Sequence, residues 1–380
     1  MKKTLMAAAA LCAFSGAAHA SSTVTLYGLL DASINYTSNV DGNSRIRMDS
    51  GEMQGSRWGL RFSEDLGGGL KAIGTIESGF NIGTGHAAQG GRLFGRQAFV
   101  GLSSDRAGTI TMGRQYLVSS DFVSPLTMNA WAGSLGTHPL DLDNLDNSHR
   151  ADNTIKYISA NYSGFQFGGS VSPGGIAGKL GNDLVWSLGA GYNNGPFTAG
   201  VSYISSRDAK TSPYNKFVKL NDMRDWKMGS HRVDVRYNVA ALGANYKFGA
   251  ATVGAVLSHS DFKAANDAAK LARNDFKAKS LSAELHASYQ LSPALQVGAG
   301  YSFTRLTIPG DTDTDSKEAL PFHQVSLGSS YALSKRTDVY VIAAAQRATG
   351  KNAVASIGDS ADFSSVKSQF KTSIGLRHKF

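Results

Sequence analysis

Hydrophobic and polar side chains alternate along most of the chain. One such segment covers residues 24–36, in which the apolar face carries Val24, Leu26, Leu30, Ala32, Ile34 and Tyr36, and the other face carries Thr25, Tyr27, Asp31, Ser33 and Asn35. Segments 281–291 and 370–380 repeat this pattern. A period of two residues predicts β-strands with one apolar and one polar face. A soluble sheet could bury the apolar face in a core, so the connections between strands must be considered as well.

Short and long connections alternate between these segments. Short turns are expected near residues 66–69, 105–108, 161–164, 193–196, 248–250, 291–294 and 333–336. Longer polar stretches are expected at about 37–55, 81–92, 117–149, 174–183, 207–234, 261–279, 306–321 and 348–366. These connections imply about sixteen strands of roughly ten residues. An even number of antiparallel strands can close, and closure leaves no unpaired backbone in lipid. The prediction is an all-β, 16-stranded antiparallel transmembrane β-barrel.

The N-terminus predicts export. Lys2 and Lys3 precede an apolar run from Leu5 to Ala18, and Ala18-His19-Ala20 forms a small-x-small cleavage site. We expect a signal peptide over residues 1–20, cleaved after Ala20, and a single barrel domain over residues 21–380. No later stretch of about 18 apolar residues occurs, which excludes membrane folds built from helices.

Composition excludes several functions. The chain has 38 Lys and Arg against 29 Asp and Glu, a formal charge of +9. These cations are scattered singly, so nucleic acid binding is not expected. Gly189-Ala190-Gly191 and Gly298-Ala299-Gly300 precede no helix and are interpreted as strand glycines. No nucleophile elbow occurs, and neither catalysis nor a cofactor or metal is expected.

Six motifs carry a resemblance to a known family. They are Val24-Thr25-Leu26-Tyr27-Gly28, Arg57-Trp58-Gly59-Leu60-Arg61-Phe62, Phe94-Gly95-Arg96-Gln97-Ala98-Phe99, Met112-Gly113-Arg114-Gln115-Tyr116, Tyr331-Ala332-Leu333-Ser334-Lys335-Arg336 and Gly375-Leu376-Arg377-His378-Lys379-Phe380. In this order they resemble the trimeric general-diffusion porins of Gram-negative outer membranes. The resemblance implies short periplasmic turns, long extracellular loops, a homotrimer, and contact with outer-membrane lipid and lipopolysaccharide. It also implies that Phe380 is an assembly signal for the barrel-assembly machinery.

The third long loop, Leu117–His149, is the expected constriction of such a porin. Its apolar side chains favour burial against the barrel wall, although a cap outside the barrel is the alternative. The candidate constriction residues of this loop are Asp121, Trp131, Asp141, Asp143 and Asp146. Many family members carry an acidic stretch where this chain has Thr127-Met128-Asn129-Ala130-Trp131. The acid is missing here.

Basic residues are expected on the facing wall. Alternation places Arg57 and Arg61 on the lumen side, opposite the lipid-facing Trp58 and Phe62. The resemblance assigns wall positions to Arg57, Arg96 and Arg150. The remaining candidates with inward phase are Lys71, Glu77 and Lys156. Arg114 has outward phase, where a charge facing lipid is costly, so it is expected at a subunit contact.

These observations predict a passive, water-filled channel for small hydrophilic solutes and ions. The wall arginines and the missing loop acid favour modest anion selectivity. Two alternatives remain. One is a channel specific for phosphate or a small organic acid, and the other is an adhesin or receptor acting through loops 207–234 and 348–366.

Overall fold

The computed structural model describes residues 22–207, 235–264, 277–309, 317–351, 353–359 and 362–380. The expected signal peptide lies outside the described residues. The strands are β1 (Ser22–Val40), β2 (Asn43–Ser50), β3 (Arg57–Gly67), β4 (Leu70–Gly79), β5 (Gln97–Ser104), β6 (Gly108–Tyr116), β7 (Arg150–Ile158), β8 (Phe165–Ser172), β9 (Val185–Asn194), β10 (Phe197–Ser206), β11 (Val235–Phe248), β12 (Ala251–Ala264), β13 (Lys277–Gln290), β14 (Leu295–Pro309), β15 (Lys317–Ala332), β16 (Thr337–Ala348) and β17 (Ser368–Lys379).

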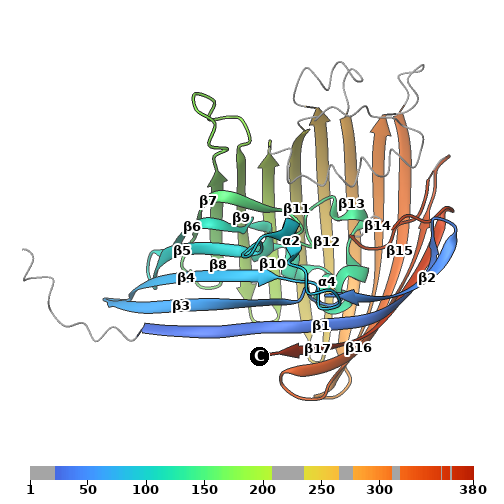
Figure 1. Cartoon of the computed structure of the whole chain (residues 1–380), viewed down its shortest axis with the longest axis horizontal. Helices are drawn as coiled ribbons and strands as arrows, with labels where there is room; N and C mark the ends of the chain where they lie inside the picture. Colours follow the sequence, from blue (N-terminus) through green and yellow to red (C-terminus); the bar gives the residue numbers. More distant parts are fainter. Residues whose placement is uncertain (1–21, 208–234, 265–276, 310–316, 352, 360–361) are drawn as a thin grey trace, which may run out of the picture.

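From β3 to β17 each strand pairs antiparallel with the next, and the sheet closes between β1 and β17 (Figure 1). β3 pairs with the first half of β1 and β2 with its second half. The two are therefore halves of one barrel strand, interrupted at residues 51–56. Counted this way, the 17 segments form a closed 16-stranded barrel, as predicted. The backbone of Phe380 completes the closure, because it exchanges hydrogen bonds of 3.0 and 3.1 Å with Gly28.

All seven predicted short turns connect strands, but the predicted first long loop, 37–55, is wrong. β1 continues to Val40, a tight turn follows at Asp41-Gly42, and β2 continues the barrel wall. Both turn residues have positive φ, as tight hairpins require. The polar composition of this stretch concealed the alternation of the outward-facing Ile46 and Met48. Strands also extend into the predicted loops 261–279 and 306–321, as far as Ala264 and Pro309.

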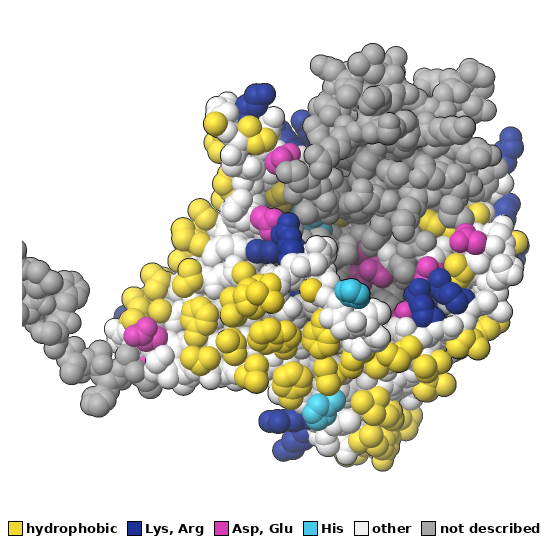
Figure 2. Space-filling model, viewed as in Figure 1, with side chains coloured by type: hydrophobic (Ala, Val, Ile, Leu, Met, Phe, Trp, Pro, Cys, Tyr) yellow, Lys and Arg dark blue, Asp and Glu magenta, His cyan; other side chains and the backbone are white. Residues whose placement is uncertain are grey.

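The two faces of the wall differ as the alternation predicts. Large apolar side chains are exposed around the outside, including Leu26, Val100, Leu188, Leu285 and Ile374. Figure 2 shows hydrophobic side chains spread over the near outer face. Small polar side chains fill buried inward positions, including Ser187, Ser260, Ser280, Ser302 and Ser373. No helix among the described residues is long and apolar enough to cross a membrane.

The segment between β6 and β7 folds into the barrel, which confirms the inward third loop. It contains α3 (Ser119–Phe122), η1 (Ser124–Leu126), α4 (Asn129–Ala132), η2 (Gly133–Gly136) and η3 (Pro139–Asp141). α3 contacts β9 and β10, η1 contacts β10 to β12, α4 contacts β15, and η2 contacts β16. The loop thus follows one side of the inner wall, inside the ring of strands (Figure 1). A separate short helix, α2 (Ala88–Gly91), lies in the second loop.

Candidate pore constriction

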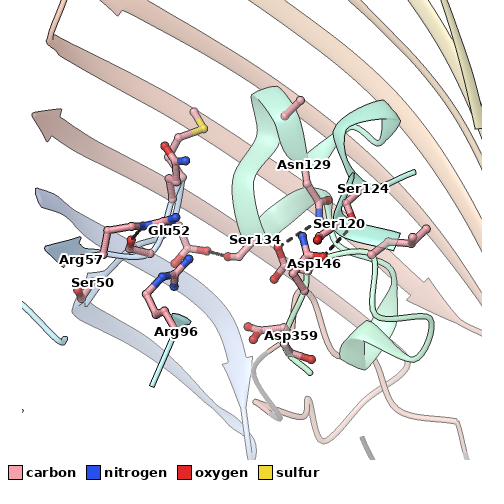
Figure 3. Close-up of a pocket in the computed structure, with 18 of the residues that line it drawn as sticks. Ser50, Glu52, Arg57, Arg96, Ser120, Ser124, Asn129, Ser134, Asp146 and Asp359 are labelled. Atoms are coloured by element: carbon pink, nitrogen blue, oxygen red, sulfur yellow. Dashed lines mark hydrogen bonds between the residues drawn. The ribbon is translucent and has the colours of Figure 1, made fainter. Parts of the chain in front are cut away.

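A polar cavity of about 990 Å³ separates the third loop from the opposite wall. Its lining includes seven Lys and Arg side chains, namely Arg47, Arg57, Arg96, Arg150, Lys371, Arg377 and Lys379. Four carboxylates also line it, namely Asp49, Glu52, Asp146 and Asp359. In Figure 3, Arg57 and Arg96 lie on one side, and Ser120, Ser124 and Asn129 of the loop lie on the other. The lining is therefore mostly polar, with an excess of positive charge.

Tyr116, at the end of β6, binds two of the wall arginines and positions them side by side. Its hydroxyl accepts hydrogen bonds from Arg96 Nη2 at 2.6 Å and from Arg150 Nη2 at 3.0 Å. The Arg150 guanidinium also lies 4.5 Å from the centre of the Tyr116 ring, a favourable cation–π distance. Sequence reasoning gave Tyr116 no role. Its hydroxyl can bind both arginines because the end of β6 turns inward, which alternation does not predict.

The three wall arginines differ in their charge partners. Arg96 Nε donates to Glu77 Oε1 at 2.7 Å, and both side chains are buried. Arg57 Nε instead donates to the carbonyl of Gly55 at 2.8 Å. Among the described residues, neither Arg57 nor Arg150 lies within 4.0 Å of a carboxylate. The positive charge available to a passing ion therefore comes from Arg57 and Arg150 more than from Arg96.

The other predicted wall residues, Arg61, Lys71, Glu77 and Lys156, face inward but differ in their contacts and exposure. Arg61 lies over the inward ring of Tyr27, 4.2 Å from its centre. Lys156 forms a 2.5 Å ion pair with Asp121 and donates to the carbonyl of Tyr116 at 3.2 Å. Lys71 keeps the inward phase of Glu77 but is exposed next to a short turn. Only Glu77 and Lys156 of these four are joined to the constriction by a hydrogen bond to Arg96 or Tyr116.

Aromatic side chains of the third loop pack directly on glycines of the wall. We call these positions, Gly189, Gly191, Gly298 and Gly328, the glycine seats. A Cβ atom at Gly298 would lie 2.5 Å from the Trp131 ring, and one at Gly328 would lie 3.0 Å from it. Likewise, a Cβ atom at Gly189 or Gly191 would lie 2.7 or 2.8 Å from the ring of Phe122. Real side chains do not approach this closely, so the loop aromatics can lie flat on the wall only where glycine is present. The two Gly-Ala-Gly stretches are strand glycines, as predicted, and Trp131 packs on the wall.

A buried ionic cluster fastens the returning limb of the loop. His138 Nδ1 lies 2.6 Å from Asp143 Oδ2, and His138 Nε2 lies 3.3 Å from Glu284 Oε2 on β13. Glu284 Oε1 also accepts the backbone N–H of Met128 at 2.8 Å, and His286 contacts the same oxygen. Burial alone would lower the pKa of His138, but Asp143 and Glu284 raise it to about 10. The imidazole is therefore a cation at neutral pH.

The loop acids differ in their access to the pore. Asp143 accepts the Ser258 hydroxyl at 2.5 Å, and Asp141 accepts the backbone N–H groups of Asp146 and Ser148 at 2.9 and 3.1 Å. Both side chains are buried behind the loop surface. Burial alone would raise the pKa of Asp143, but His138 holds it below its ordinary value. Of the four predicted loop acids, Asp146 alone lines the cavity.

Glu52, in the interruption between β2 and β3, ties the far end of the loop to the wall. Its carboxylate accepts the Ser134 hydroxyl (Figure 3), and its carbonyl accepts the Ser134 N–H at 2.7 Å. Lys371 Nζ and Asn35 Nδ2 donate to the same carboxylate at 3.0 and 2.6 Å. Asp31 fixes this segment, because its carboxylate accepts the N–H groups of residues 53 and 54 at 2.9 and 2.6 Å.

The described part of the last long loop, residues 349–351, 353–359 and 362–367, also enters the barrel. Ala353, Ala355 and Ile357 are buried, and the carbonyl of Gly358 accepts the N–H of Leu140 at 3.2 Å. Asp359 follows and lines the cavity (Figure 3). This part of the proposed receptor loop therefore packs inside the barrel, while residues 208–234 lie outside the described residues. Sequence reasoning missed Asp359 because nothing local marks that loop as inward-folding.

Arg114 lies at the outer face, as predicted from its phase, and has partners within its own subunit. It donates to the carbonyl of Gly95 at 2.7 Å and to Asp152 at 2.5 Å. Arg92 of the second loop donates to both oxygens of Asp152, at 2.8 and 2.9 Å. Among the described residues, no group of three or more His, Cys, Asp and Glu side chains is arranged to hold a metal.

Comparisons with known proteins agree with this geometry. The family model described as Gram-negative porin matches residues 7–351. An outer membrane porin protein of Bordetella pertussis is 40% identical over 230 residues, which cover 53% of this chain and 59% of that protein. Outer membrane porin protein 32 of Delftia acidovorans is 29% identical and covers 90% of this chain and 88% of its own length.

Solved structures extend the likeness to the fold. An anion-selective porin from Comamonas acidovorans superposes with a TM-score of 0.73 at 25% identity, covering 94% of this chain and all of that one. A trimer form of OmpT, an outer membrane protein of Vibrio cholerae, superposes with a TM-score of 0.64 at 17% identity and shows the shared fold alone. The family match covers most of the chain, and the barrel, the inward third loop and the polar cavity accompany it. The chain belongs to the Gram-negative porin family of outer-membrane β-barrels.

Proposed function

We propose that the protein is a passive, anion-preferring diffusion channel of the outer membrane. The observation that carries this proposal is the mostly polar cavity between the third loop and the arginine wall, about 990 Å³ in volume. Small hydrophilic solutes pass through such a cavity without a bound state being required. The Porin family and this barrel architecture consist of channel proteins, and the proposal assigns no reaction to the chain.

The charge arrangement supports the anion preference. Arg57 and Arg150 face the cavity, and neither has a carboxylate within 4.0 Å among the described residues. The facing loop presents Ser120, Ser124 and Asn129 together with one acid, Asp146, so the seven cations of the lining outnumber its four carboxylates. At a narrow, low-dielectric passage, fixed positive charge raises the local concentration of anions and lowers that of cations. The likeness to an anion-selective porin is in keeping with this preference.

Reversal potentials test the proposal directly. Purified protein is inserted into a planar bilayer between unequal KCl concentrations, and the zero-current voltage is measured. We expect stepwise, ohmic conductance and a reversal potential whose sign corresponds to chloride preference. A cation-selective potential would refute the anion preference. Conductance that saturates with one phosphate or carboxylate ion, but not with chloride, would instead indicate a substrate-specific channel.

We propose a homotrimer whose subunit contact includes the outer face of β6 and β7. Arg114, Arg92 and Asp152 form a charged group there, where direct exposure to lipid is costly. Burial against a neighbouring subunit supplies the polar surroundings that lipid lacks. Arg114→Leu is expected to weaken trimers in native mass spectrometry, and unchanged trimers would place the contact elsewhere.

We also propose that residues 1–20 are a signal peptide cleaved after Ala20 and that Phe380 is recognised during assembly. The Phe380 side chain remains about 42% exposed beside Gly28 at the barrel seam. Sequencing the N-terminus of the mature protein tests the cleavage site, for which Ser21 is the expected first residue. Phe380→Ala is expected to reduce the amount of folded protein in the outer membrane without changing the conductance of the channels that assemble.

A further inference from the structure

Four carboxylates line the pore cavity, and they form two pairs of different kinds. Asp49 and Glu52 each form an ion pair, at 2.5 and 3.0 Å, with a cation of the same lining. Asp146 and Asp359 come from the third loop and the last loop, which both fold into the barrel. In Figure 3, Asp359 lies close to Asp146 and across the opening from Arg57. The last loop therefore contributes negative charge opposite the arginine wall.

Two buried glutamines of the wall fasten the backbone ahead of Asp359. Gln346 of β16 bonds both backbone groups of Ser356, because its Oε1 accepts the N–H at 2.7 Å and its Nε2 donates to the carbonyl at 3.0 Å. Gln369 of β17 accepts the N–H of Ile357 at 2.8 Å through its own Oε1. The chain ahead of Asp359 therefore cannot move away from the wall without breaking three buried hydrogen bonds, and each such loss is costly.

The chain beyond Asp359 is fastened as well, at residue 362. Gln369 Nε2 donates to the carbonyl of Asp362 at 2.9 Å, so this one side chain bonds the loop on both sides of Asp359. The carboxylate of Asp362 also accepts hydrogen bonds from Arg45 and Arg47 of β2. Asp359 thus lies between two points of the loop that are bonded to the barrel wall, and its place beside the opening is fixed by the wall.

We propose that Asp359 is a selectivity-determining residue that limits the anion preference of the arginine wall, and that Gln369 is its positioning residue. In a narrow passage a fixed carboxylate raises the local concentration of cations and lowers that of anions. This effect is opposite to that of Arg57 and Arg150, which line the same cavity. The last loop and the wall together therefore give a modest preference for anions. The inference rests on the ion-conducting function proposed above and refines it.

Reversal potentials of the purified protein in a KCl gradient test the proposal. Asp359→Asn removes the charge and keeps the shape of the side chain. A unit charge acts on chloride and potassium ions with opposite sign, so the ratio of chloride to potassium permeability is expected to rise about threefold. Asp41→Asn is the matched control, because it removes the same charge at the exposed turn between β1 and β2, outside the cavity lining. We expect it to leave the permeability ratio unchanged.

Restoring a charge at the same position gives a second test. Cys12, the only cysteine of the sequence, lies in the proposed signal peptide, so the mature chain is expected to carry no thiol. Asp359→Cys is expected to raise the ratio of chloride to potassium permeability as Asp359→Asn does. Reaction of the new thiol with a sulfonate-bearing methanethiosulfonate reagent is expected to restore the wild-type ratio, and an ammonium-bearing reagent is expected to raise it further. Wild-type protein treated with both reagents is the control.

Gln369→Ala tests the positioning role. It removes the side-chain bonds on both sides of Asp359 and leaves the carboxylate itself in the chain. We expect the ratio of chloride to potassium permeability to rise in this variant, and we expect Asp359→Asn to raise it little further in the same background. A merely structural role for Gln369 would lower the thermal unfolding temperature and leave the effect of Asp359→Asn at its full size, which would contradict the positioning role.

Two results would overturn the assignment of Asp359. One is a change in permeability ratio for Asp359→Asn that is no larger than the change for Asp41→Asn, and the other is a shift toward potassium. The wild-type potential separates this inference from the proposed function. A wild type that prefers cations would refute the anion preference, whereas a rise of the ratio in Asp359→Asn would still identify Asp359 as selectivity-determining.

Discussion

The two walls that face each other across the constriction differ in the size of their inward side chains. On the wall formed by β3 to β7, the inward positions carry long cations and their holder, including Arg57, Arg150 and Tyr116. On the wall formed by β9 to β16, several corresponding positions are glycines, including Gly189, Gly298 and Gly328. Both walls have the same strand period and the same apolar exterior.

This difference shows how one barrel obtains an asymmetric pore. Where the inner surface is smooth, Phe122 and Trp131 lie on the wall and the third loop covers it. Where the inner surface carries guanidinium groups, no described segment covers it and the cavity stays open. The side of the lumen that the loop occupies is thus set by residue size, and the charge of the remaining opening is set by the uncovered wall.

The largest expected effect concerns the ionic cluster that holds the loop on the smooth wall. Protonated His138 lies between Asp143 and Glu284, and its pKa is raised from about 6.5 to about 10. A raised pKa stabilises the folded form fully below about pH 6.5, and this contribution declines as pH rises and is lost above about 10. We expect the thermal unfolding temperature in detergent to fall, and open-channel current noise to rise, between pH 7 and pH 10.

His138→Gln provides the control for this pH dependence, because glutamine does not titrate. It leaves two buried carboxylates without their cation, a change that costs about 3 kcal/mol or more. The variant is expected to unfold at a lower temperature at pH 7 and to show a flatter pH profile above it. If the unfolding temperature of the variant fell with pH as steeply as that of the wild type, the titration would belong to other groups, such as lysines.

The next largest effect is expected on ion selectivity, from the arginines of the wall that the third loop leaves uncovered. Replacing Arg57 and Arg150 together by Glu reverses the charge of the two wall arginines that have no carboxylate within 4.0 Å among the described residues. Two unit charges about 8 Å apart interact by about 2 kcal/mol at an effective dielectric constant of about 20, so the ratio of anion to cation permeability should change by tenfold or more. Reversal potentials in a KCl gradient measure this permeability ratio. Arg61→Glu, farther along β3, is the matched control, and an equal shift there would show that the whole lumen sets selectivity.

Alternation predicted the outer belt and the inward arginine at position 57, and turn-forming residues predicted all seven short turns, because these features depend on local patterns. It could not predict Arg96. Strict alternation from the outward-facing Val100 would point residue 96 outward, but β5 begins at Gln97 and the irregular backbone before it brings Arg96 to Glu77. The resemblance located Arg96 correctly, whereas its neutralising partner became visible only in three dimensions.

Contacts between distant segments account for the rest of what the sequence did not reveal. Glu52 looked like part of a polar loop, yet it holds Ser134, which lies 82 residues away. Asp359 lines the cavity because its loop packs beside the third loop through Gly358 and Leu140. Asp141 and Asp143 looked like pore-facing acids, but their hydrogen bonds turn them behind the loop. No spacing in the sequence encodes these pairings.

A moderate effect is expected from enlarging one residue of the smooth wall. Gly298→Val places side-chain atoms where the Trp131 ring lies, because a Cβ there is already 2.5 Å from it. Overpacking of this kind costs about 1–3 kcal/mol. We expect noisier open-channel current and faster proteolysis of the third loop. Ala299→Val, the next residue on β14, points outward and should leave both measurements unchanged. Equal effects of the two substitutions would point to strand disruption.

The smallest effect is expected at the contact where the loop reaches the other wall. Ser134→Ala removes the hydroxyl that donates to the Glu52 carboxylate, while the bond between the Ser134 N–H and the Glu52 carbonyl, 2.7 Å long, remains. The loss of one such hydrogen bond is worth about 1 kcal/mol. Ser120→Ala is matched to it, because Ser120 also lines the cavity and, within the described part of the chain, its hydroxyl donates to the carbonyl of Leu117 in its own loop. A small rise in current noise is expected for Ser134→Ala alone, since of these two hydroxyls the one on Ser134 bonds to the interrupted strand and the one on Ser120 does not. The same rise in Ser120→Ala would mean that the loop is held by its own internal hydrogen bonds and that the glycine seats, without Glu52, suffice to fix its position.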